Sequence, residues 1–318
     1  MSEKKFCLLA DPSRSSFEQA KKIFAEISKE SDAFDLIPIE IKRFRDGELK
    51  PKIVENIRRK ECFFIHDSHL PPAEWFLELC LINQALKNSS AQEINVILPY
   101  LKFSRQDRKD EPRVSLSARV IADAIQLYAD RVVTLDVHNP ATEGFYGIPF
   151  DNLHSFPIVI NYLNTHYSTI LKDITIMSTD AGGATRAKNF AKKIGKSDLV
   201  IGYKARNKEG DVEELKILGD VQGKNILIID DMIDSGDTLL SACTTARKEG
   251  AKKVYAYCTH GIFSKGIENF KNNFDKLFIS DSIMQKPAEN IEVIPLEKLF
   301  ASAILKISKG ESISMLFN

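Results

Sequence analysis

The sequence predicts an α/β fold in which mostly parallel sheets are flanked by helices and are organised as two similar domains. Short runs of β-branched or aromatic residues alternate with longer segments of helical periodicity, a pattern typical of βαβ units. This alternation restarts in the second half of the chain. The length of 318 residues also exceeds the size at which a single hydrophobic core usually stops growing. Two α/β domains therefore account for both the pattern and the length.

In the first half, the expected strands share a β-branched or aromatic composition. They are residues 6–10, 37–44, 62–67, 94–100 and 132–137. The expected helices between them carry apolar residues at i, i+3, i+4 and i+7. This period is clearest over residues 16–29 and 117–128.

In the second half, the same alternation predicts strands over residues 174–177, 199–203, 226–229, 254–257 and 277–279, with a helix over 184–194. The pattern relaxes near residues 149–157, where two prolines lie close together. We therefore expect domains over residues 1–153 and 154–318. Residues 204–214 are crowded with charge and are predicted to form a mobile loop.

Charge and cysteine usage narrow the class of protein. The 44 Lys+Arg balance 44 Asp+Glu, so no global field draws the chain to nucleic acid or to a membrane. The apolar runs are far shorter than the roughly 20 residues of a membrane-spanning helix, and the N-terminal run is too short for a signal peptide. The five cysteines include no CxxC pair and are expected to be reduced thiols. These features predict a cytoplasmic protein.

The strongest local signal is the segment 226–239, in which an apolar strand leads into paired carboxylates, a Ser-Gly turn and an amphipathic helix. A strand, a tight turn and a helix N-terminus present several free backbone N–H groups, which suits a phosphate. Gly236 permits close approach of the backbone, and Ser235 and Thr238 add hydroxyl donors. Asp230 and Asp231 are placed to bind sugar hydroxyls or a hydrated cation. The alternative is a plain helix cap, which would explain only one of the acids.

A second segment follows the strand at residues 94–100. Its Arg105, Arg108 and Lys109 form a dense cationic cluster that suits a triphosphate, and Gln106 is available for a nucleobase edge. The alternative is a solvated charged loop without a ligand.

Several motifs together resemble the ribose-phosphate pyrophosphokinase family. The segment Arg105-Gln-Asp-Arg-Lys109 is similar to the RQDRK motif of that family, and Phe44-Arg-Asp-Gly-Glu48 to its F-S-D-G-E motif. Asp180-Ala-Gly-Gly183, Thr259-His-Gly-Ile-Phe263 and Gly310-Glu-Ser-Ile-Ser314 have counterparts in the same order. The resemblance spans nearly the whole chain and implies two phosphoribosyltransferase-like domains.

The resemblance implies a reaction and the residues that serve it. Members of this family transfer pyrophosphate from MgATP to the C1 hydroxyl of ribose 5-phosphate, which gives phosphoribosyl pyrophosphate and AMP. The implied ribose 5-phosphate site is Asp230, Asp231, Asp234, Ser235, Gly236, Asp237 and Thr238. The implied ATP site is Arg105, Gln106, Asp107 and His138, with Phe44, Asp46 and Glu48 supplied by a neighbouring subunit. The implied Mg²⁺ ligands are His138 and Asp180, and the implied catalytic cations are Lys204 and Arg206.

The sequence departs from the family at several positions. Asp237 places a carboxylate beside the expected phosphate, and Thr179 replaces a common proline. Residues 71–75 replace an asparagine-containing stretch, and Asn56 stands where a serine of the regulatory phosphate site is common. Two alternatives therefore stay beside an active synthetase: a catalytically weak regulatory subunit that joins an active homologue, and a phosphoribosyltransferase. The resemblance implies a homo-oligomer, with a dimer as the active unit and a hexamer as an alternative assembly.

Overall fold

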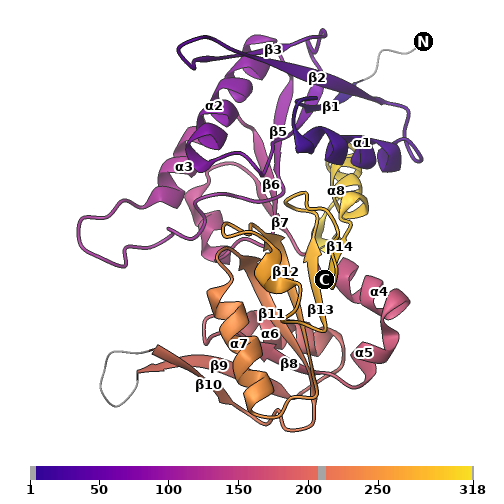
Figure 1. Cartoon of the computed structure of the whole chain (residues 1–318). Coiled ribbons are helices and arrows are strands. Elements are labelled where there is room, and N and C mark those ends of the chain that lie inside the picture. The colour runs from indigo at the N-terminus through magenta and orange to yellow at the C-terminus, as the bar shows by residue number, and fades with distance from the viewer. Residues whose placement is uncertain (1–4, 207–212, 317–318) are drawn as a thin grey trace. The chain divides into compact units, whose positions relative to one another are not determined.

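The computed structural model describes residues 5–206 and 213–316, which divide into two compact units (Figure 1). The first unit runs to His154 and takes in Ser282–Met284 and the chain from Leu296 onward. The second consists of Ser155–Asp281 and Gln285–Pro295. In the described part of the chain, no helix is long and apolar enough to cross a membrane.

The first unit is built on a seven-stranded sheet with the order β3-β2-β1-β4-β5-β6-β7. Its strands are β1 (Phe6–Ala10), β2 (Phe34–Arg43), β3 (Leu49–Ile53), β4 (Glu61–Ile65), β5 (Glu93–Leu98), β6 (Arg131–Leu135) and β7 (Phe150–Leu153). Its helices are α1 (Ser15–Ile27), α2 (Pro72–Asn88), α3 (Ser117–Ile125) and α8 (Glu297–Ser308), with short 3₁₀ turns at η1 (Pro140–Phe145) and η3 (Ser314–Leu316). Only β3 pairs antiparallel within the described sheet, because a tight hairpin joins it to β2.

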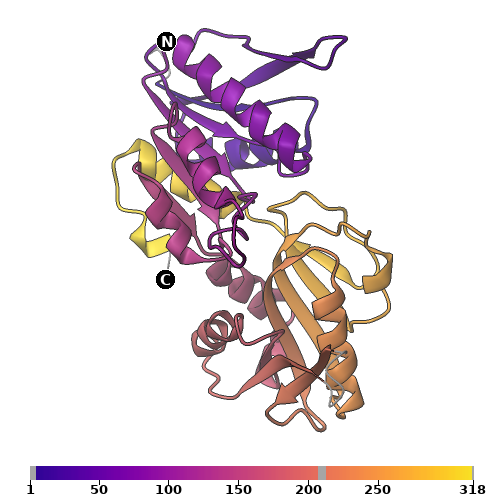
Figure 2. The same cartoon turned by 90° about the vertical axis from the view of Figure 1, so that its left-hand side faces the viewer.

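Helices cover both faces of this sheet (Figures 1 and 2). The chain turns one way from β1 through α1 to β2, and the other way from β4 through α2, β5 and α3 to β6. Because such crossovers are right-handed, the two groups of helices lie on opposite faces. Trp75, Leu79 and Ile82 of α2 pack with Cys7 and Cys62 of the sheet on one face. On the other face α8 packs against α1.

The second unit repeats this architecture with a seven-stranded sheet in the order β10-β9-β8-β11-β12-β13-β14. Its strands are β8 (Thr175–Ser178), β9 (Leu199–Arg206), β10 (Glu213–Leu218), β11 (Asn225–Ile233), β12 (Lys253–Gly261), β13 (Lys276–Ser280) and β14 (Ile291–Ile294). Its helices are α4 (Phe156–His166), α5 (Ser168–Lys172), α6 (Ala184–Lys193) and α7 (Asp237–Lys248), with a 3₁₀ turn at η2 (Glu268–Phe270).

Strand β11 shows why an uninterrupted apolar run was needed at the centre of this sheet. Successive side chains of a strand point to opposite faces. Ile226 and Ile228 pack in the core under α7, whereas Leu227 and Ile229 pack in the core under α4 and α6. A central parallel strand buried on both faces therefore reads as continuous Ile and Leu rather than as alternation.

The structure confirms the predicted fold class of two mostly parallel, helix-flanked sheets. The sequence pattern missed four strands, β3, β7, β10 and β14, which are the edge strands of the two sheets and have mixed polarity. The prediction of a loop over 204–214 is wrong at both ends, because β9 continues to Arg206 and β10 begins at Glu213. The C-terminal helix α8 groups with the first unit because its apolar face packs on α1, whereas the sequence pattern had suggested the second half.

Strand order reverses between β1 and β4 in the first unit and between β8 and β11 in the second. In open α/β sheets, ligands bind outside the carboxyl ends of the strands at such switch points. In the second unit, the polar residues predicted from the sequence lie at the ends of β8 and β11, at the switch point. In the first unit, they follow β5 and β6 or lie on the turn between β2 and β3.

Candidate active site

The phosphate-type loop lies between β11 and α7 at the switch point of the second unit. Gly236 adopts a left-handed conformation with φ +84° and precedes the first residue of α7. A β-carbon at Gly236 would lie 2.0 Å from Cζ of Phe270, so both backbone conformation and space require glycine. Phe270 is itself fixed edge-on against Phe263, with 5.1 Å between ring centroids. The loop thus turns tightly against an aromatic wall and opens the N-terminus of a twelve-residue helix.

Asp230 and Asp231 lie near the carboxyl end of β11, beside the guanidinium of Arg186 and the hydroxyl of Thr179. Thr179 Oγ1 donates a 2.7 Å hydrogen bond to Asp230 Oδ2. Arg186 of α6 places its two terminal nitrogens 3.7 Å from Asp230 Oδ1 and 3.3 Å from Asp231 Oδ2. Burial, and then the neighbouring charge of Asp231, raise the pKa of Asp230 to about 7, although Thr179 and Arg186 act in the opposite direction. Asp230 can therefore gain or lose a proton near neutral pH.

The carboxylate of Asp237 pairs with a lysine outside the loop. It is the first residue of α7, it is exposed, and its Oδ2 is 2.9 Å from Lys265 Nζ. The hydrogen bond from Lys265 lowers the pKa of Asp237, which keeps the pair ionised. The local negative charge that the sequence suggested beside the phosphate position is thus compensated by a lysine more than twenty residues away.

Asp180 opens a second turn at the same edge of the sheet. Its Oδ1 accepts a 2.7 Å hydrogen bond from Gly183 N, and the residue is exposed. The preceding Thr179 contacts β9 so closely that a β-carbon at Gly202 would lie 2.5 Å from Thr179 O. Mg²⁺ is usually held by one or two carboxylates together with substrate phosphates, so the donor at Asp180 is of the right kind. Among the described residues there is no group of three His, Cys, Asp or Glu side chains that could hold a metal ion.

In the first unit, the segment with Arg105, Gln106 and Asp107 forms the loop between β5 and α3. Its backbone is held at Gln106, whose N donates to Phe103 O at 3.0 Å and whose O accepts from Ala118 N of α3 at 3.1 Å. Arg105 and Gln106 are exposed, so their side chains are accessible to a ligand.

The loop after β6 approaches this segment. Asn139 Nδ2 donates a hydrogen bond to Asp107 Oδ2, and Asn139 Oδ1 caps η1 by accepting from Ala141 N. His138, the residue before Asn139, is exposed. The structure therefore brings together Asp107 and the His138 segment, which are about 30 positions apart in the sequence.

Phe44, Asp46 and Glu48 occupy the turn of the β2–β3 hairpin. The turn is closed by hydrogen bonds from Phe44 N to Glu48 O and from Gly47 N to Phe44 O, at 2.8 and 3.0 Å. Asp46 Oδ1 accepts from Glu48 N at 3.1 Å. All three side chains are exposed, and Phe44 is 41% exposed. The hairpin turn therefore has an aromatic ring that is accessible to a ligand or to another protein surface.

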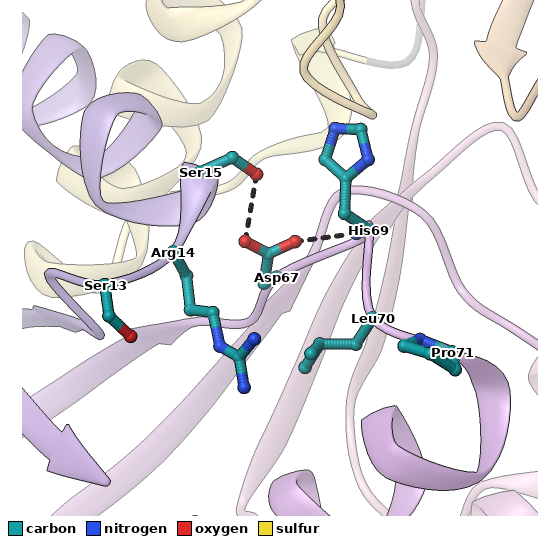
Figure 3. A pocket seen from close by; sticks show the side chains of 7 residues that line it. All are labelled: Ser13, Arg14, Ser15, Asp67, His69, Leu70 and Pro71. Atoms are coloured by element: carbon teal, nitrogen blue, oxygen red, sulfur yellow. Dashed lines mark hydrogen bonds between the residues drawn. The ribbon is translucent and has the colours of Figure 1, made fainter.

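The switch point of the first unit carries a pocket at the N-terminus of α1. It is lined by Ser13, Arg14, Ser15, Asp67, His69, Leu70 and Pro71 (Figure 3). Asp67 accepts hydrogen bonds from Ser15 Oγ, Ser16 N and His69 N at 2.9, 3.2 and 2.6 Å. Burial would raise the pKa of Asp67, but these hydrogen bonds outweigh it and lower the pKa. A carboxylate of the chain thus already holds the anion position at this helix N-terminus.

The predicted catalytic cations are Lys204 and Arg206 of β9. In the antiparallel pairing with β10, Lys204 is opposite Leu215 and Arg206 is opposite Glu213. Their side chains lie outside the part of the chain that the structure describes, as does the segment 207–212. Their roles remain predictions.

Sequence reasoning missed three residues at these sites: Arg186, Asn139 and Lys265. Each acts through a partner that is distant in sequence, and none carries a local motif of its own. From the sequence, Thr179 stands out only as a departure from the proline that is common in the family. Its hydroxyl is what lets it reach Asp230, a contact that a proline could not make.

The fold and the site together define a two-unit, doubly wound α/β protein with a phosphate-type loop at the switch point of its second unit. Residues 13–128 match the N-terminal domain of ribose phosphate pyrophosphokinase, and residues 207–318 match the phosphoribosyl synthetase-associated domain. The chain belongs to the ribose-phosphate pyrophosphokinase family.

Individual relatives agree with this assignment. The ribose-phosphate pyrophosphokinase of Chlorobaculum tepidum is 38% identical over 310 residues, which cover 96% of this chain and 93% of the relative. That of Bradyrhizobium diazoefficiens is 38% identical over 287 residues, 87% of this chain and 89% of the relative. The crystal structure of phosphoribosylpyrophosphate synthetase from Mycobacterium smegmatis matches with a TM-score of 0.85 at 26% identity, and covers 96% of this chain and 99% of that one.

Proposed function

We propose that this protein transfers the pyrophosphoryl group of MgATP to the C1 hydroxyl of ribose 5-phosphate, forming phosphoribosyl pyrophosphate and AMP. The observation that carries the proposal is the β11–α7 junction, where paired aspartates lead into a tight loop at a helix N-terminus. It occurs in a chain whose family membership rests on matches along both halves.

Ribose 5-phosphate would bind at this junction. Backbone N–H groups of the loop from Asp234 to Thr238 would donate hydrogen bonds to the 5-phosphate, assisted by the positive end of the α7 dipole. Asp230 and Asp231 would accept hydrogen bonds from the sugar hydroxyls. Arg186 and Thr179 keep both carboxylates oriented, so the sugar would meet groups whose positions are already set.

ATP would bind to the exposed groups of the first unit. Arg105 would bind phosphate oxygens, and Gln106 would form hydrogen bonds with the edge of the base. Asp107, the next residue, is held in place by a hydrogen bond from Asn139. Phe44, Asp46 and Glu48 would contact the adenine of a neighbouring protomer, which fits their exposure at the hairpin turn. Asp180 and His138 would hold Mg²⁺ together with the phosphates; the ion would neutralise charge on the triphosphate.

Lys204 and Arg206 would stabilise the charge that develops on the transferred group. Pyrophosphoryl transfer needs little covalent chemistry from the protein. It depends on positioning of the two substrates and on neutralisation of the charge on the phosphates. Two cations from one strand can supply that neutralisation when ATP and sugar are both bound.

The proposed working form is a cytoplasmic homo-oligomer with a dimer as its active unit. The exposed hairpin turn supports a site shared between protomers. The five cysteines are free thiols in the structure, in keeping with a reducing compartment.

The test is to incubate the purified protein with Mg²⁺, ATP and ribose 5-phosphate and to quantify both products. We expect AMP and phosphoribosyl pyrophosphate in equal amounts. No AMP above background would refute the proposal. If activity required an added homologue, the protein would be the regulatory subunit considered above; pyrophosphate release with a free base as acceptor would instead identify a phosphoribosyltransferase.

A further inference from the structure

The hairpin that carries Phe44, Asp46 and Glu48 is tied to helix α2 by an ion pair. Arg43, the last residue of β2, donates from its terminal nitrogen to Glu74 Oε1 at 2.5 Å. Its other terminal nitrogen is 3.4 Å from Gly47 O, inside the turn itself. One guanidinium therefore contacts both the turn and the helix beneath β3.

Glu74 connects this arginine to the interior of the first unit. The same Oε1 accepts a 3.1 Å hydrogen bond from Arg14. Arg14 also pairs with Glu78, one helical turn after Glu74, at 3.2 Å, and with Asp11 at 3.6 Å. Asp11 and Glu78 are almost fully buried, so the far end of the network is fixed in the core of the unit.

The geometry of Glu74 suits this connection. It lies in the first turn of α2, where a carboxylate is favoured by the helix dipole. Trp75, the next residue, is fully buried and its carbonyl oxygen lies 2.9 Å from His66 Nε2. The first turn of α2 is consequently anchored on its inner side, while Glu74 extends outward to the hairpin.

Without this tie, the turn depends on the pairing of β2 with β3, an edge strand of five residues, and on the packing of β3 against α2. Short edge pairings open and twist more readily than central ones because they have a partner on one side only. The direction in which Phe44 points would then vary, although the turn itself would still be closed by its own hydrogen bonds.

We infer that Arg43 and Glu74 are positioning residues for nucleotide binding, because they fix the direction in which the hairpin presents Phe44, Asp46 and Glu48. They act through the hairpin and do not contact the nucleotide. The inference rests on the proposed function, since the hairpin is assigned there to the adenine of a neighbouring protomer. Neither residue is assigned to a site by the sequence, and Glu74 lies in the stretch 71–75, where this chain departs from the family.

The expected size of the effect is modest. The side chains of Arg43 and Glu74 are 50% and 27% exposed, and exposed ion pairs contribute little to stability. Loss of such a contact corresponds to about a two- to fivefold change in an equilibrium constant. A matched control exists in the second unit, where Arg247 pairs with Asp275 at 2.8 Å and the two side chains are 41% and 29% exposed.

The experiment compares Arg43→Gln, Arg43→Lys and Glu74→Gln with the wild-type protein and with Arg247→Gln. It measures kcat, the KM for each substrate, and the Kd for ATP. We expect the KM and Kd for ATP to rise about two- to fivefold in Arg43→Gln, with kcat and the KM for ribose 5-phosphate unchanged. Arg43→Lys should restore most of the affinity, and Arg247→Gln should match the wild type. The effects of Arg43→Gln and Glu74→Gln on the Kd for ATP should add to less than their sum in the double variant, because both changes remove the contact between Arg43 and Glu74.

Two outcomes would overturn the inference. One is an unchanged affinity for ATP in Arg43→Gln. The other is an equal loss of kcat and of affinity for both substrates, accompanied by a changed fluorescence of Trp75, the only tryptophan, which would mean general damage to the unit. The Kd for ATP decides the matter even if the wild type forms no AMP, so failure of the proposed function and failure of this inference are distinguishable.

Discussion

The hydroxyl of Thr179 donates a 2.7 Å hydrogen bond to Oδ2 of Asp230, across the switch point between β8 and β11. Thr179 is almost fully buried, and its own carbonyl is approached closely by β9 at Gly202. Thr179 therefore has little freedom to move away from Asp230. Its donation favours the ionised form of Asp230, which burial disfavours. This hydroxyl thus orients the first aspartate of the proposed sugar site and, together with Arg186, opposes the burial that raises the pKa of that aspartate.

Replacing Thr179 with Val keeps the shape of the side chain but removes this donor. A hydrogen bond to a charged group is worth about 1.5–3 kcal/mol. Because this one orients Asp230 and does not contact the substrate, only part of that value should be lost from binding, and the KM for ribose 5-phosphate should rise about three- to tenfold. The pKa of Asp230 should also move above its value of about 7, which shifts the acid limb of the pH dependence of that KM to higher pH. Steady-state kinetics between pH 6 and 9 would measure both effects. Thr165→Val, which removes a hydroxyl bonded to Asn161 O on exposed α4, is the control and should change neither.

Gly236→Ala should damage the loop for two separable reasons. The left-handed backbone costs a residue with a side chain about 1–2 kcal/mol, and the new methyl group would overlap the ring of Phe270. Gly266 has a similar φ of +81° and nothing within 4 Å of its virtual β-carbon, so Gly266→Ala isolates the backbone cost. We expect Gly236→Ala to lose binding of ribose 5-phosphate and to be the less stable variant in urea denaturation. Equal stability of the two variants would contradict the role of Phe270.

Asp237 provides a test of charge near the proposed phosphate. Because its carboxylate pairs with Lys265 and is exposed, Asp237→Ala should leave the KM for ribose 5-phosphate unchanged or slightly lower. Lys265→Ala should raise that KM, since the carboxylate is then uncompensated. The double variant should return to the wild-type value. A large loss in Asp237→Ala alone would show that the carboxylate contacts the substrate directly.

Much of this organisation was accessible from the sequence because it is local. The run 226–229 and the residues that follow predicted a strand, a turn and a helix, and β11, Gly236 and α7 realise them in that order. Central parallel strands are buried on both faces and therefore have an unmistakable composition. Edge strands such as β3 and β10 lack it, because half of their side chains are polar, and they were missed.

The contacts between distant segments could not be predicted in this way. Arg186 reaches the two aspartates from α6, and Glu74 joins Arg14 to Arg43 across about 60 and 30 positions of sequence. Read locally, each of these charges is an ordinary polar side chain without a partner nearby in the sequence. Only the packing of α6 and α2 on their sheets determines which charges meet. The same holds for α8, whose apolar stripe gives no indication that its partner is α1 at the other end of the chain.

Buried Glu78 predicts a pH dependence of stability. Burial raises its pKa from about 4.5 to about 7, although Arg14 opposes this shift. Because the folded-state pKa is the higher one, the native protein binds the proton more tightly. The stabilisation is complete below pH 4.5 and is lost as the pH rises through 7. Glu78→Gln cannot ionise, so its free energy of unfolding should increase relative to the wild type between pH 5 and 8. Urea denaturation across this range checks the sign, with Glu18→Gln on exposed α1 as the control for removal of a carboxylate.

Replacing Lys204 with Ala tests whether the β9 cation acts on the reacting group. A charge that stabilises only the transition state contributes to kcat and leaves ground-state binding alone. We therefore expect kcat to fall by about a hundredfold or more, while the Kd for ATP stays within about twofold of the wild type. Lys216→Ala is the matched control, because Lys216 is an exposed lysine on the same hairpin, paired in register with Tyr203. It should leave both quantities unchanged. An unaltered kcat in Lys204→Ala would show that this residue takes no part in the chemical step. If only the affinity for ATP fell, Lys204 would be a binding residue instead.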